Sequence, residues 1–273
     1  MKRIYPYAAG FAAIVALLAL PVASASAGDH HASAAKPTVV LVHGAWADGS
    51  SWDGVVRDLQ KQGYTVDVPP TPLRGLKSDS EYLQDYLSTV KGPIVLAGHS
   101  YGGSVITDAA TGNKNVKALV YVDAFIPDKG ESVNDLLTPK NPEEPGLNPE
   151  ALFNFVPFPG APKGDADLYL KPEVLPVAFA NGLPASEAAV LAATQRPIAA
   201  NALGEKSSAP AWKTIPSWAV IGTEDHIIPP PLQEFMTKRA GSHVTDVKSG
   251  HLSLITHPKV VAGVIATAAK HVH

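Results

Sequence analysis

The feature that most restricts the fold of this chain is its alternation of short, apolar, β-branched runs with longer amphipathic segments. The run Thr38–Val42 is apolar throughout, which is typical of a strand buried on both faces of a parallel sheet. Similar runs predict further strands at Tyr64–Val68, Pro93–Ala97, Val116–Val122, Ser217–Ile221 and Val244–Val247. Apolar residues at helical spacing predict helices at Ser51–Gln62, Ser80–Val90, Ser104–Ala110 and Lys259–Lys270. Strands that alternate with helices imply an α/β fold with a mostly parallel sheet of about six strands and helices on both faces.

One long stretch between two of these strands breaks the alternation. Residues 127–212 are rich in proline, which disfavours long regular elements, but they also carry many aromatic and aliphatic side chains. A disordered linker is the alternative, although linkers of that kind hold few aromatic residues. We therefore expect residues 127–212 to form an inserted lid that packs over another part of the chain, with a short helix at Ser186–Thr194.

Composition places the chain among globular proteins and excludes several kinds of partner and chemistry. Of its 273 residues, 45% are hydrophobic and 17% are charged, and the formal net charge is −3. This balance is too apolar for a disordered chain, and without a Lys/Arg-rich run it argues against nucleic acid as the main partner. The chain contains no cysteine, which excludes disulfides, thiolate catalysis and cysteine-ligated metals.

The N-terminal residues have the pattern of an export signal. A basic pair at positions 2 and 3 precedes the apolar run Ala8–Leu20, and Ala25–Ala27 has the small-x-small pattern that signal peptidases cleave. The apolar run is short for a membrane-spanning helix, which needs about 20 residues, and an uncleaved anchor is the alternative. We predict a signal peptide over residues 1–27 and one domain over residues 28–273. The protein is then expected to be secreted or periplasmic, with no stable membrane span after processing.

One motif carries the chemistry. Gly98-His99-Ser100-Tyr101-Gly102 fits the pattern G-x-S-x-G, and it follows a predicted buried strand and opens a helix, which is the context the pattern requires. Glycines leave room for the tight, strained turn that holds the serine clear of the sheet. The helix N-terminus beside it offers free N–H groups that suit a developing oxyanion. We therefore expect Ser100 to be a nucleophile, the alternative being a glycine-rich turn with an incidental serine.

A serine hydroxyl is a weak nucleophile and needs partner residues that activate it. His251 lies just after the last predicted strand, and the order of residues along the chain makes it the expected base. Asp225 follows the strand Ser217–Ile221 and is the expected carboxylate that orients the imidazole. Asp123, at the end of the fourth predicted strand, is the rival for this role, and Glu224 is the third candidate.

The oxyanion and the substrate need further groups. We expect the loop after the first strand to supply the backbone N–H of Ala45, with the N–H of Tyr101 as the other donor. The apolar content of the lid predicts a pocket for a small or medium, largely apolar molecule. Five side chains are expected to line it: Trp46, Phe155, Phe158, Phe179 and Leu252. No metal or other cofactor is required by this chemistry.

These motifs resemble those of the α/β-hydrolase superfamily, and within it the branch of small-lid esterases and hydroxynitrile lyases. The resemblance implies the α/β-hydrolase fold, a lid between the fourth and fifth of the predicted strands, and the same nucleophile, base and acid. It covers about Pro37 to Lys270 and rests on Leu41–Trp46, Gly98–Gly103, Gly222–Asp225 and Gly250-His251.

The sequence and this resemblance together predict an exported serine hydrolase that cleaves carboxylic esters of small to medium, largely apolar substrates through an acyl-enzyme on Ser100. A cofactor-free perhydrolase or haloperoxidase with the same three residues is the alternative. A lyase is disfavoured, because Leu252 stands where lyases of this branch carry a lysine after the histidine. A non-catalytic ligand-binding protein is disfavoured by the complete set of nucleophile, base and orienting acid.

Overall fold

A computed structural model of the protein describes residues 36–138 and 148–272, and its centre is a parallel sheet. The sheet has six strands in the order β2-β1-β3-β4-β8-β9, and each neighbouring pair runs parallel. This confirms the predicted α/β fold and the number of strands. The strands are β1 Thr38–Val42, β2 Val66–Asp67, β3 Ile94–His99, β4 Val116–Val122, β8 Ser217–Gly222 and β9 His243–Val247.

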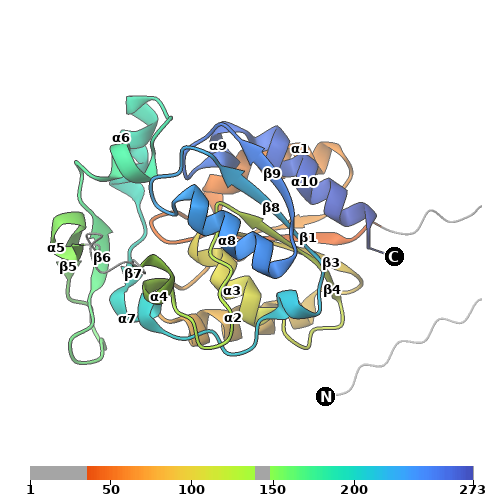
Figure 1. The fold of residues 1–273 in the computed structure, drawn as a ribbon, viewed down its shortest axis with the longest axis horizontal. Helices are drawn as coiled ribbons and strands as arrows, with labels where there is room; N and C mark the ends of the chain where they lie inside the picture. Colours follow the sequence, from red (N-terminus) through yellow and green to blue (C-terminus); the bar gives the residue numbers. More distant parts are fainter. Residues whose placement is uncertain (1–35, 139–147, 273) are drawn as a thin grey trace, which may run out of the picture. The chain divides into compact units, whose positions relative to one another are not determined.

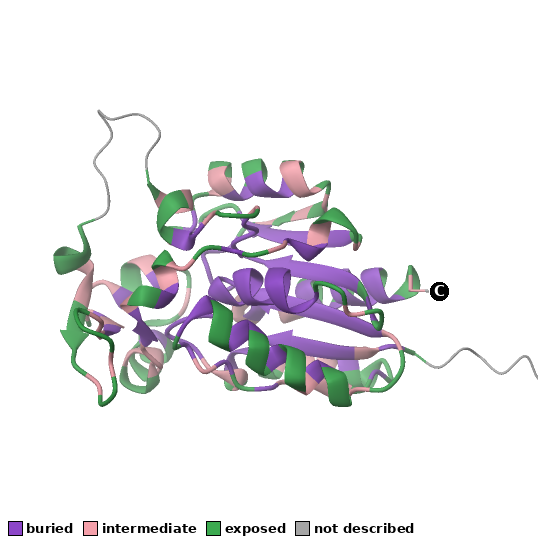
Figure 2. Cartoon of the chain, turned by 90° about the horizontal axis from the view of Figure 1, so that it is seen from below, coloured by how far each residue is buried: buried purple, intermediate pink, exposed green. Residues whose placement is uncertain are grey.

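Helices cover both faces of this sheet. Helices α1 and α10 pack against each other over one face, and α2, α3 and α8 cover the other (Figure 1). Every residue of β3 is buried, and buried residues are concentrated in the inner strands (Figure 2). An inner strand has helices on both sides, which is why its sequence is apolar without alternation. The helices are α1 Asp53–Lys61, α2 Leu76–Thr89, α3 Tyr101–Ala109, α8 Pro230–Ala240 and α10 Pro258–Lys270.

A second, smaller sheet is formed by the chain between β4 and β8. It is antiparallel, with the strand order β5-β6-β7, and it lies at the left of the main sheet in Figure 1. The expected helix at Ser186–Thr194 is present as α6, Ala185–Thr194. The other elements are α4 Val133–Leu137, α5 Pro149–Leu152, β5 Phe153–Val156, β6 Asp167–Leu170, η2 Leu175–Phe179, β7 Ile198–Ala199 and α7 Ala200–Gly204.

Hydrogen bonds and one ion pair fasten the second sheet to the loops after β1 and β2. The Trp46 indole N–H donates to the carbonyl of Leu168 at 2.9 Å, and the N–H of Ala199 donates to the carbonyl of Leu73 at 3.0 Å. The Arg74 guanidinium lies 2.6 Å from the carboxylate of Asp167. These contacts hold the second sheet beside the carboxyl-terminal ends of the central strands.

The predicted signal peptide lies outside the described residues. The lid boundaries at residues 127 and 212 stay a prediction, although this stretch includes the second sheet. Within residues 36–138 and 148–272, no helix has the length and apolar character needed to cross a bilayer.

Candidate active site

The turn between β3 and α3 presents Ser100. Its backbone has φ 53° and ψ −125°, in a region that residues with a side chain rarely adopt. Local hydrogen bonds hold the turn, because the N–H of Ser100 donates to Val122 and the Ser100 carbonyl accepts from Gly103 and Phe125. The serine is therefore held at the start of α3 in a conformation that its surroundings impose.

The glycines of the motif are required by close approaches of neighbouring backbone. A Cβ on Gly98 would lie 2.5 Å from the carbonyl oxygen of Gly102. A Cβ on Gly102 would lie 2.6 Å from the oxygen of Val42, and one on Gly103 would lie 2.4 Å from the oxygen of Phe125. Each distance is far inside van der Waals contact, so a side chain at any of these positions would displace the turn.

The structure brings together the three side chains expected for catalysis. The Ser100 Oγ lies 2.9 Å from Nε2 of His251, and Nδ1 of His251 lies 2.8 Å from Oδ2 of Asp225. All three residues are buried. With an ionised Asp225, Nδ1 of the imidazole donates its hydrogen to that acceptor, which leaves Nε2 free to accept the hydrogen of the serine hydroxyl.

The Asp225 carboxylate is fixed by donors on both of its oxygens. Oδ1 accepts from the N–H groups of Ile227 and Ile228, at 2.7 and 3.0 Å. Oδ2 accepts from Nε2 of Gln233 at 2.8 Å in addition to His251. Four donors on one buried carboxylate stabilise its ionised form and fix its direction.

The two rival carboxylates lie elsewhere. Asp123 is fully buried, and it accepts hydrogen bonds from the N–H of Gly222 at 2.7 Å and from the N–H and hydroxyl of Ser253. Burial, with the nearby charge of Asp225 as the second cause, raises the pKa of Asp123 to about 7. Glu224 is exposed beside Lys248, at 3.7 Å. Neither of them makes a hydrogen bond to the imidazole of His251 among the described residues.

Two further histidines support the surrounding loops. The ring of His99 is fully buried, and its Nε2 lies 2.9 Å from the carbonyl oxygen of His251, to which it must donate. Burial lowers the pKa of His99 well below its usual value, so the ring is neutral. His43 accepts at Nε2 from the N–H of Thr71 at 3.0 Å, and thereby ties the loop after β1 to the loop after β2.

The two expected oxyanion donors lie at the cavity beside Ser100. Ala45 and Tyr101 both line it, and within the described part of the chain neither backbone N–H donates to another group. A Cβ on Gly44 would lie 2.8 Å from the Cβ of Ser100, so the loop after β1 passes directly against the serine. Both N–H groups are therefore free to donate to the oxygen of a bound carbonyl group.

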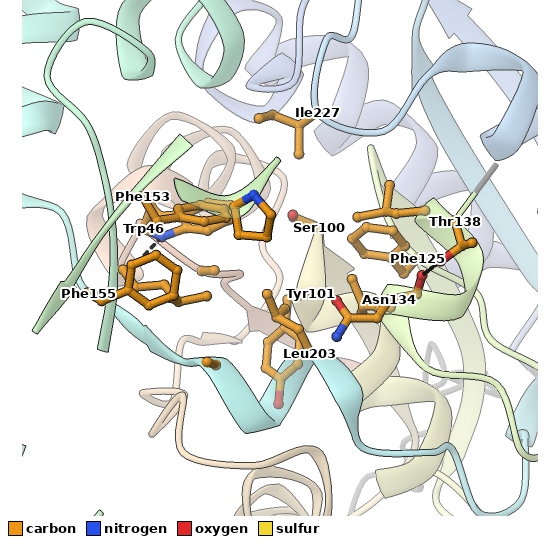
Figure 3. A pocket seen from close by; sticks show the side chains of 16 residues that line it. Trp46, Ser100, Tyr101, Phe125, Asn134, Thr138, Phe153, Phe155, Leu203 and Ile227 are labelled. Atoms are coloured by element: carbon orange, nitrogen blue, oxygen red, sulfur yellow. Dashed lines mark hydrogen bonds between the residues drawn. The ribbon is translucent and has the colours of Figure 1, made fainter. Parts of the chain in front are cut away.

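Ser100 opens into a cavity of about 410 Å³. Figure 3 shows its hydroxyl between two walls, with Trp46, Phe153 and Phe155 on one side and Phe125, Asn134 and Thr138 on the other. The lining is largely apolar and comes from the loops after strands of the main sheet, from the second sheet, and from the short helices beside it. It consists of Ala45, Trp46, Ser100, Tyr101, Phe125, Val133, Asn134, Leu137, Thr138, Pro149, Phe153, Phe155, Leu168, Ala200, Leu203 and Ile227.

Of the five side chains expected to line this cavity, Trp46 and Phe155 do so. The other three are not among its lining residues. Phe158 lies under the Arg74 guanidinium, 4.7 Å from it, and Leu252 is buried. Phe179 is also fully buried, with its ring 5.4 Å from that of His251. Aromatic composition does not tell which side of a short element faces inward, so the phenylalanines that line the cavity could not be separated from those that do not.

The cavity residues that sequence reasoning missed come mainly from α4 and from the ends of other elements. Val133, Asn134 and Leu137 of α4 all line the cavity. The spacing of Val133 and Leu137, four residues apart, is the only sign in the sequence that a helix face lies here. Within residues 36–138 and 148–272, no group of three or more side chains could hold a metal ion.

Comparisons with known proteins agree with this geometry. The esterase of Nocardioides sp. (strain SG-4G) that hydrolyses carbendazim is 36% identical over 130 residues, which cover 43% of this chain and 51% of the esterase. The chain thus matches about half the length of that relative. The α/β hydrolase nvfD of Aspergillus novofumigatus is 25% identical over 258 residues, or 86% of this chain and 97% of nvfD.

A solved structure is similar over nearly its whole length. An extracellular α/β-hydrolase from a Paenibacillus species has a TM-score of 0.71 and 26% sequence identity, and the match covers 85% of this chain and 98% of that protein. The model of the Alpha/beta hydrolase family matches residues 39–264, from β1 into α10. The parallel sheet and the serine turn agree with this match, which shows that the chain belongs to the α/β-hydrolase family.

Proposed function

We propose that this protein is a serine hydrolase of the carboxylesterase type, which cleaves esters of small to medium, largely apolar substrates. One observation carries the proposal: the hydrogen-bonded series Ser100, His251 and Asp225 ends on a hydroxyl that faces an apolar cavity. Acyl transfer needs a nucleophile, a base in contact with it, and a group that orients the base. The similar esterase from Nocardioides also supports ester cleavage.

In the first half of the reaction, Ser100 Oγ attacks the ester carbonyl carbon while Nε2 of His251 accepts the hydroxyl proton. The carbonyl oxygen becomes an oxyanion, and the free N–H groups of Ala45 and Tyr101 stabilise it. The protonated imidazole then gives its proton to the leaving alkoxy oxygen. The alcohol departs, and the acyl group remains on Ser100 as an ester.

In the second half, water replaces the alcohol. His251 takes a proton from the water as the water oxygen attacks the acyl carbon, and the same two N–H groups stabilise the new oxyanion. The imidazole returns the proton to Ser100 Oγ when the acid product leaves. Asp225 does not change protonation; it holds the imidazole in the tautomer that donates from Nδ1 and stabilises its positive charge.

The cavity supports the substrate class. Its volume, about 410 Å³, is in the range of sites for small molecules, about 300–1,000 Å³. Aromatic and aliphatic side chains form most of the wall, so apolar acyl or alcohol groups gain by leaving water. The polar groups that remain are gathered near Ser100 and on α4.

Hydrolysis of p-nitrophenyl butyrate tests the proposal. We expect a burst of p-nitrophenol stoichiometric with enzyme, or steady turnover where deacylation is fast. Ser100→Ala is expected to reduce kcat/KM by at least about 10³-fold, because the acyl-enzyme can no longer form. Ser88→Ala, on the exposed side of α2, is the matched control and is expected to keep wild-type activity. Full activity of Ser100→Ala would overturn the mechanism.

We further propose that the protein is secreted or periplasmic after removal of residues 1–27. The basic start, the apolar run and the small residues at 25 and 27 support this assignment. The similar hydrolase from Paenibacillus is described as extracellular, which is in agreement with it.

A further inference from the structure

The loops that carry Asp225 and His251 lie side by side. The N–H of Thr223 donates to the carbonyl of Val247 at 2.9 Å, and the N–H of Glu224 donates to the carbonyl of Ser249 at 2.9 Å. These bonds join the end of β8 to the end of β9, a few residues before Asp225 and His251 in the sequence. The relative position of the base and its orienting acid therefore depends on how firmly these two loops are held.

Asn181 spans both loops from outside the main sheet. It follows η2, and its side-chain Nδ2 donates to the carbonyl of Glu224 at 2.7 Å, on the loop that carries Asp225. The same amide group lies against Gly250, the residue before His251. Its Oδ1 is shielded from solvent and accepts no hydrogen bond from the described residues. A buried amide oxygen without a hydrogen bond lowers the stability of the fold, so its presence at this junction needs a structural or functional explanation.

The identity of residue 250 agrees with this contact. Gly250 does not have a positive φ, so its backbone does not demand glycine. A Cβ at this position would instead lie 2.3 Å from Oδ1 and 2.5 Å from Nδ2 of Asn181. A side chain at position 250 would therefore displace the Asn181 amide from its present place, so the absence of a side chain at Gly250 fits the close approach of that amide.

Two neighbours of Asn181 reinforce the same junction. Nδ1 of His226, the residue after Asp225, donates to the carbonyl of Val177 at 3.1 Å. The ring of Phe179 packs against the imidazole of His251 at 5.4 Å and against Trp46 at 5.9 Å. The segment from Leu175 to Asn181 thus contacts the acid loop, the base loop and the base itself.

We propose that Asn181 is a positioning residue, which fixes the loop of Asp225 against the loop of His251 and so holds the imidazole in line with Ser100. This inference rests on the proposed function, because it concerns the efficiency of the same three residues. Asn181 does not line the cavity, so it acts on the reaction through the loops and not through contact with substrate.

The first test is Asn181→Leu, which keeps the branched shape and the number of non-hydrogen atoms of the side chain and removes the hydrogen bond to Glu224. We expect kcat for p-nitrophenyl acetate to fall about tenfold with KM changed less than about twofold, because a small misplacement of a catalytic group slows the reaction without weakening binding. Asn115→Leu, an exposed asparagine just before β4 at the end of the sheet away from the site, is the matched control and is expected to keep wild-type values. Unchanged kcat in a folded Asn181→Leu protein, or a rise in KM alone, would overturn the proposal.

The second test asks whether Asn181 and Gly250 act as a pair. Gly250→Ala is expected to reduce kcat on its own, because the new methyl group collides with the amide. Asn181→Ala removes the colliding atoms, so the double variant Gly250→Ala/Asn181→Ala is expected to be no worse than Asn181→Ala alone. Effects that multiply in the double variant would mean that the two residues act independently, and would contradict the inference.

A spectroscopic readout separates this inference from the proposed function. The low-field proton resonance of the His251 Nδ1–H bonded to Asp225, assigned by its loss in His251→Gln, is expected to broaden in Asn181→Leu and to stay sharp in Asn115→Leu. This measurement needs no ester turnover. If the wild type cleaves esters through Ser100 but the resonance and kcat are unchanged in Asn181→Leu, only the positioning role fails. If no ester is cleaved while the resonance broadens as expected, only the proposed function fails.

Discussion

The carboxylate of Asp225 is the most completely bonded group of the site, since both of its oxygens already have donors in the free protein. In Asp225→Asn, one carboxylate oxygen is replaced by an NH₂ group, so either the backbone donors or the imidazole N–H loses its acceptor. We expect kcat to fall by about 10³–10⁴-fold, because the imidazole is then held in the wrong tautomer. Ester assays with a circular-dichroism melting curve measure this effect and verify folding. A fall of less than about tenfold would show that another group orients His251.

The raised pKa of Asp123 predicts that the free energy of unfolding depends on pH. Its pKa is raised to about 7, mainly by burial, whereas an aspartate in an unfolded chain titrates near about 3.9. Between these values the native state binds more protons than the unfolded state, so Asp123 makes the free energy of unfolding decrease as pH rises from about 4 to about 7. One site contributes a slope of at most about 1.4 kcal/mol per pH unit.

Asp123→Asn removes this titration and keeps the shape of the side chain. Urea unfolding at pH 5.0, 6.0 and 7.0, values chosen to lie within that window, is expected to give a flatter pH dependence for the variant than for the wild type. Parallel curves for the two proteins would mean that Asp123 does not titrate in this interval.

Sequence reasoning located the reacting side chains better than the cavity wall. Ser100, Asp225 and His251 could be selected because each follows a strand of a parallel sheet, and the ends of such strands meet at one edge. The side toward which the Phe179 side chain points could not be predicted, because η2 is a single π-helical turn whose sequence has no repeating pattern. The role that Asn181 is proposed to play depends on an approach between segments that are distant in the sequence, and no local pattern encodes it.

At the scale of elements, strand β5 forms one wall of the cavity. Phe153 on β5 stacks on Trp46, with ring centroids 5.4 Å apart and an interplanar angle of 21°. Phe153→Leu removes this stacking and part of the apolar wall, so less apolar surface of the substrate is buried, and we expect KM for p-nitrophenyl butyrate to rise about 2–10-fold with little change in kcat. Phe158→Leu is the control, since Phe158 does not line the cavity. Equal KM values for the two variants would exclude this wall from binding the substrate.

The inner strands were predictable and several outer elements were not. Val116–Val122 and Thr38–Val42 form β4 and β1 with the predicted bounds, because strands covered on both faces are marked by unbroken apolar runs. Helix α8 is not among the predicted helices; it begins at Pro230, and proline is compatible with the first turn of a helix. Strands β5 to β7 have only two to four residues each, so their sequences carry little periodicity.

At the scale of the whole molecule, the export proposal predicts the start of the mature chain. Expression of the full sequence in a bacterium with an active signal peptidase is expected to give a periplasmic or secreted protein whose first residue is Gly28. Intact-mass spectrometry of the purified protein measures this directly. A protein that retains residues 1–27 in the membrane fraction would favour the uncleaved anchor, and one that retains them in the cytoplasm would contradict export.

The reacting side chains and most of the cavity wall come from different parts of the chain. Ser100, Asp225 and His251 follow strands of the main sheet, whereas Phe153, Leu137 and their neighbours belong to the stretch between β4 and β8. Mutations in that stretch can therefore alter which molecules are accepted while the bond-making atoms keep their places. A change of substrate preference is therefore open to substitutions on α4 and β5, whereas a substitution of Asn181, which contacts the loops of Asp225 and His251, is expected to disturb the reacting groups themselves.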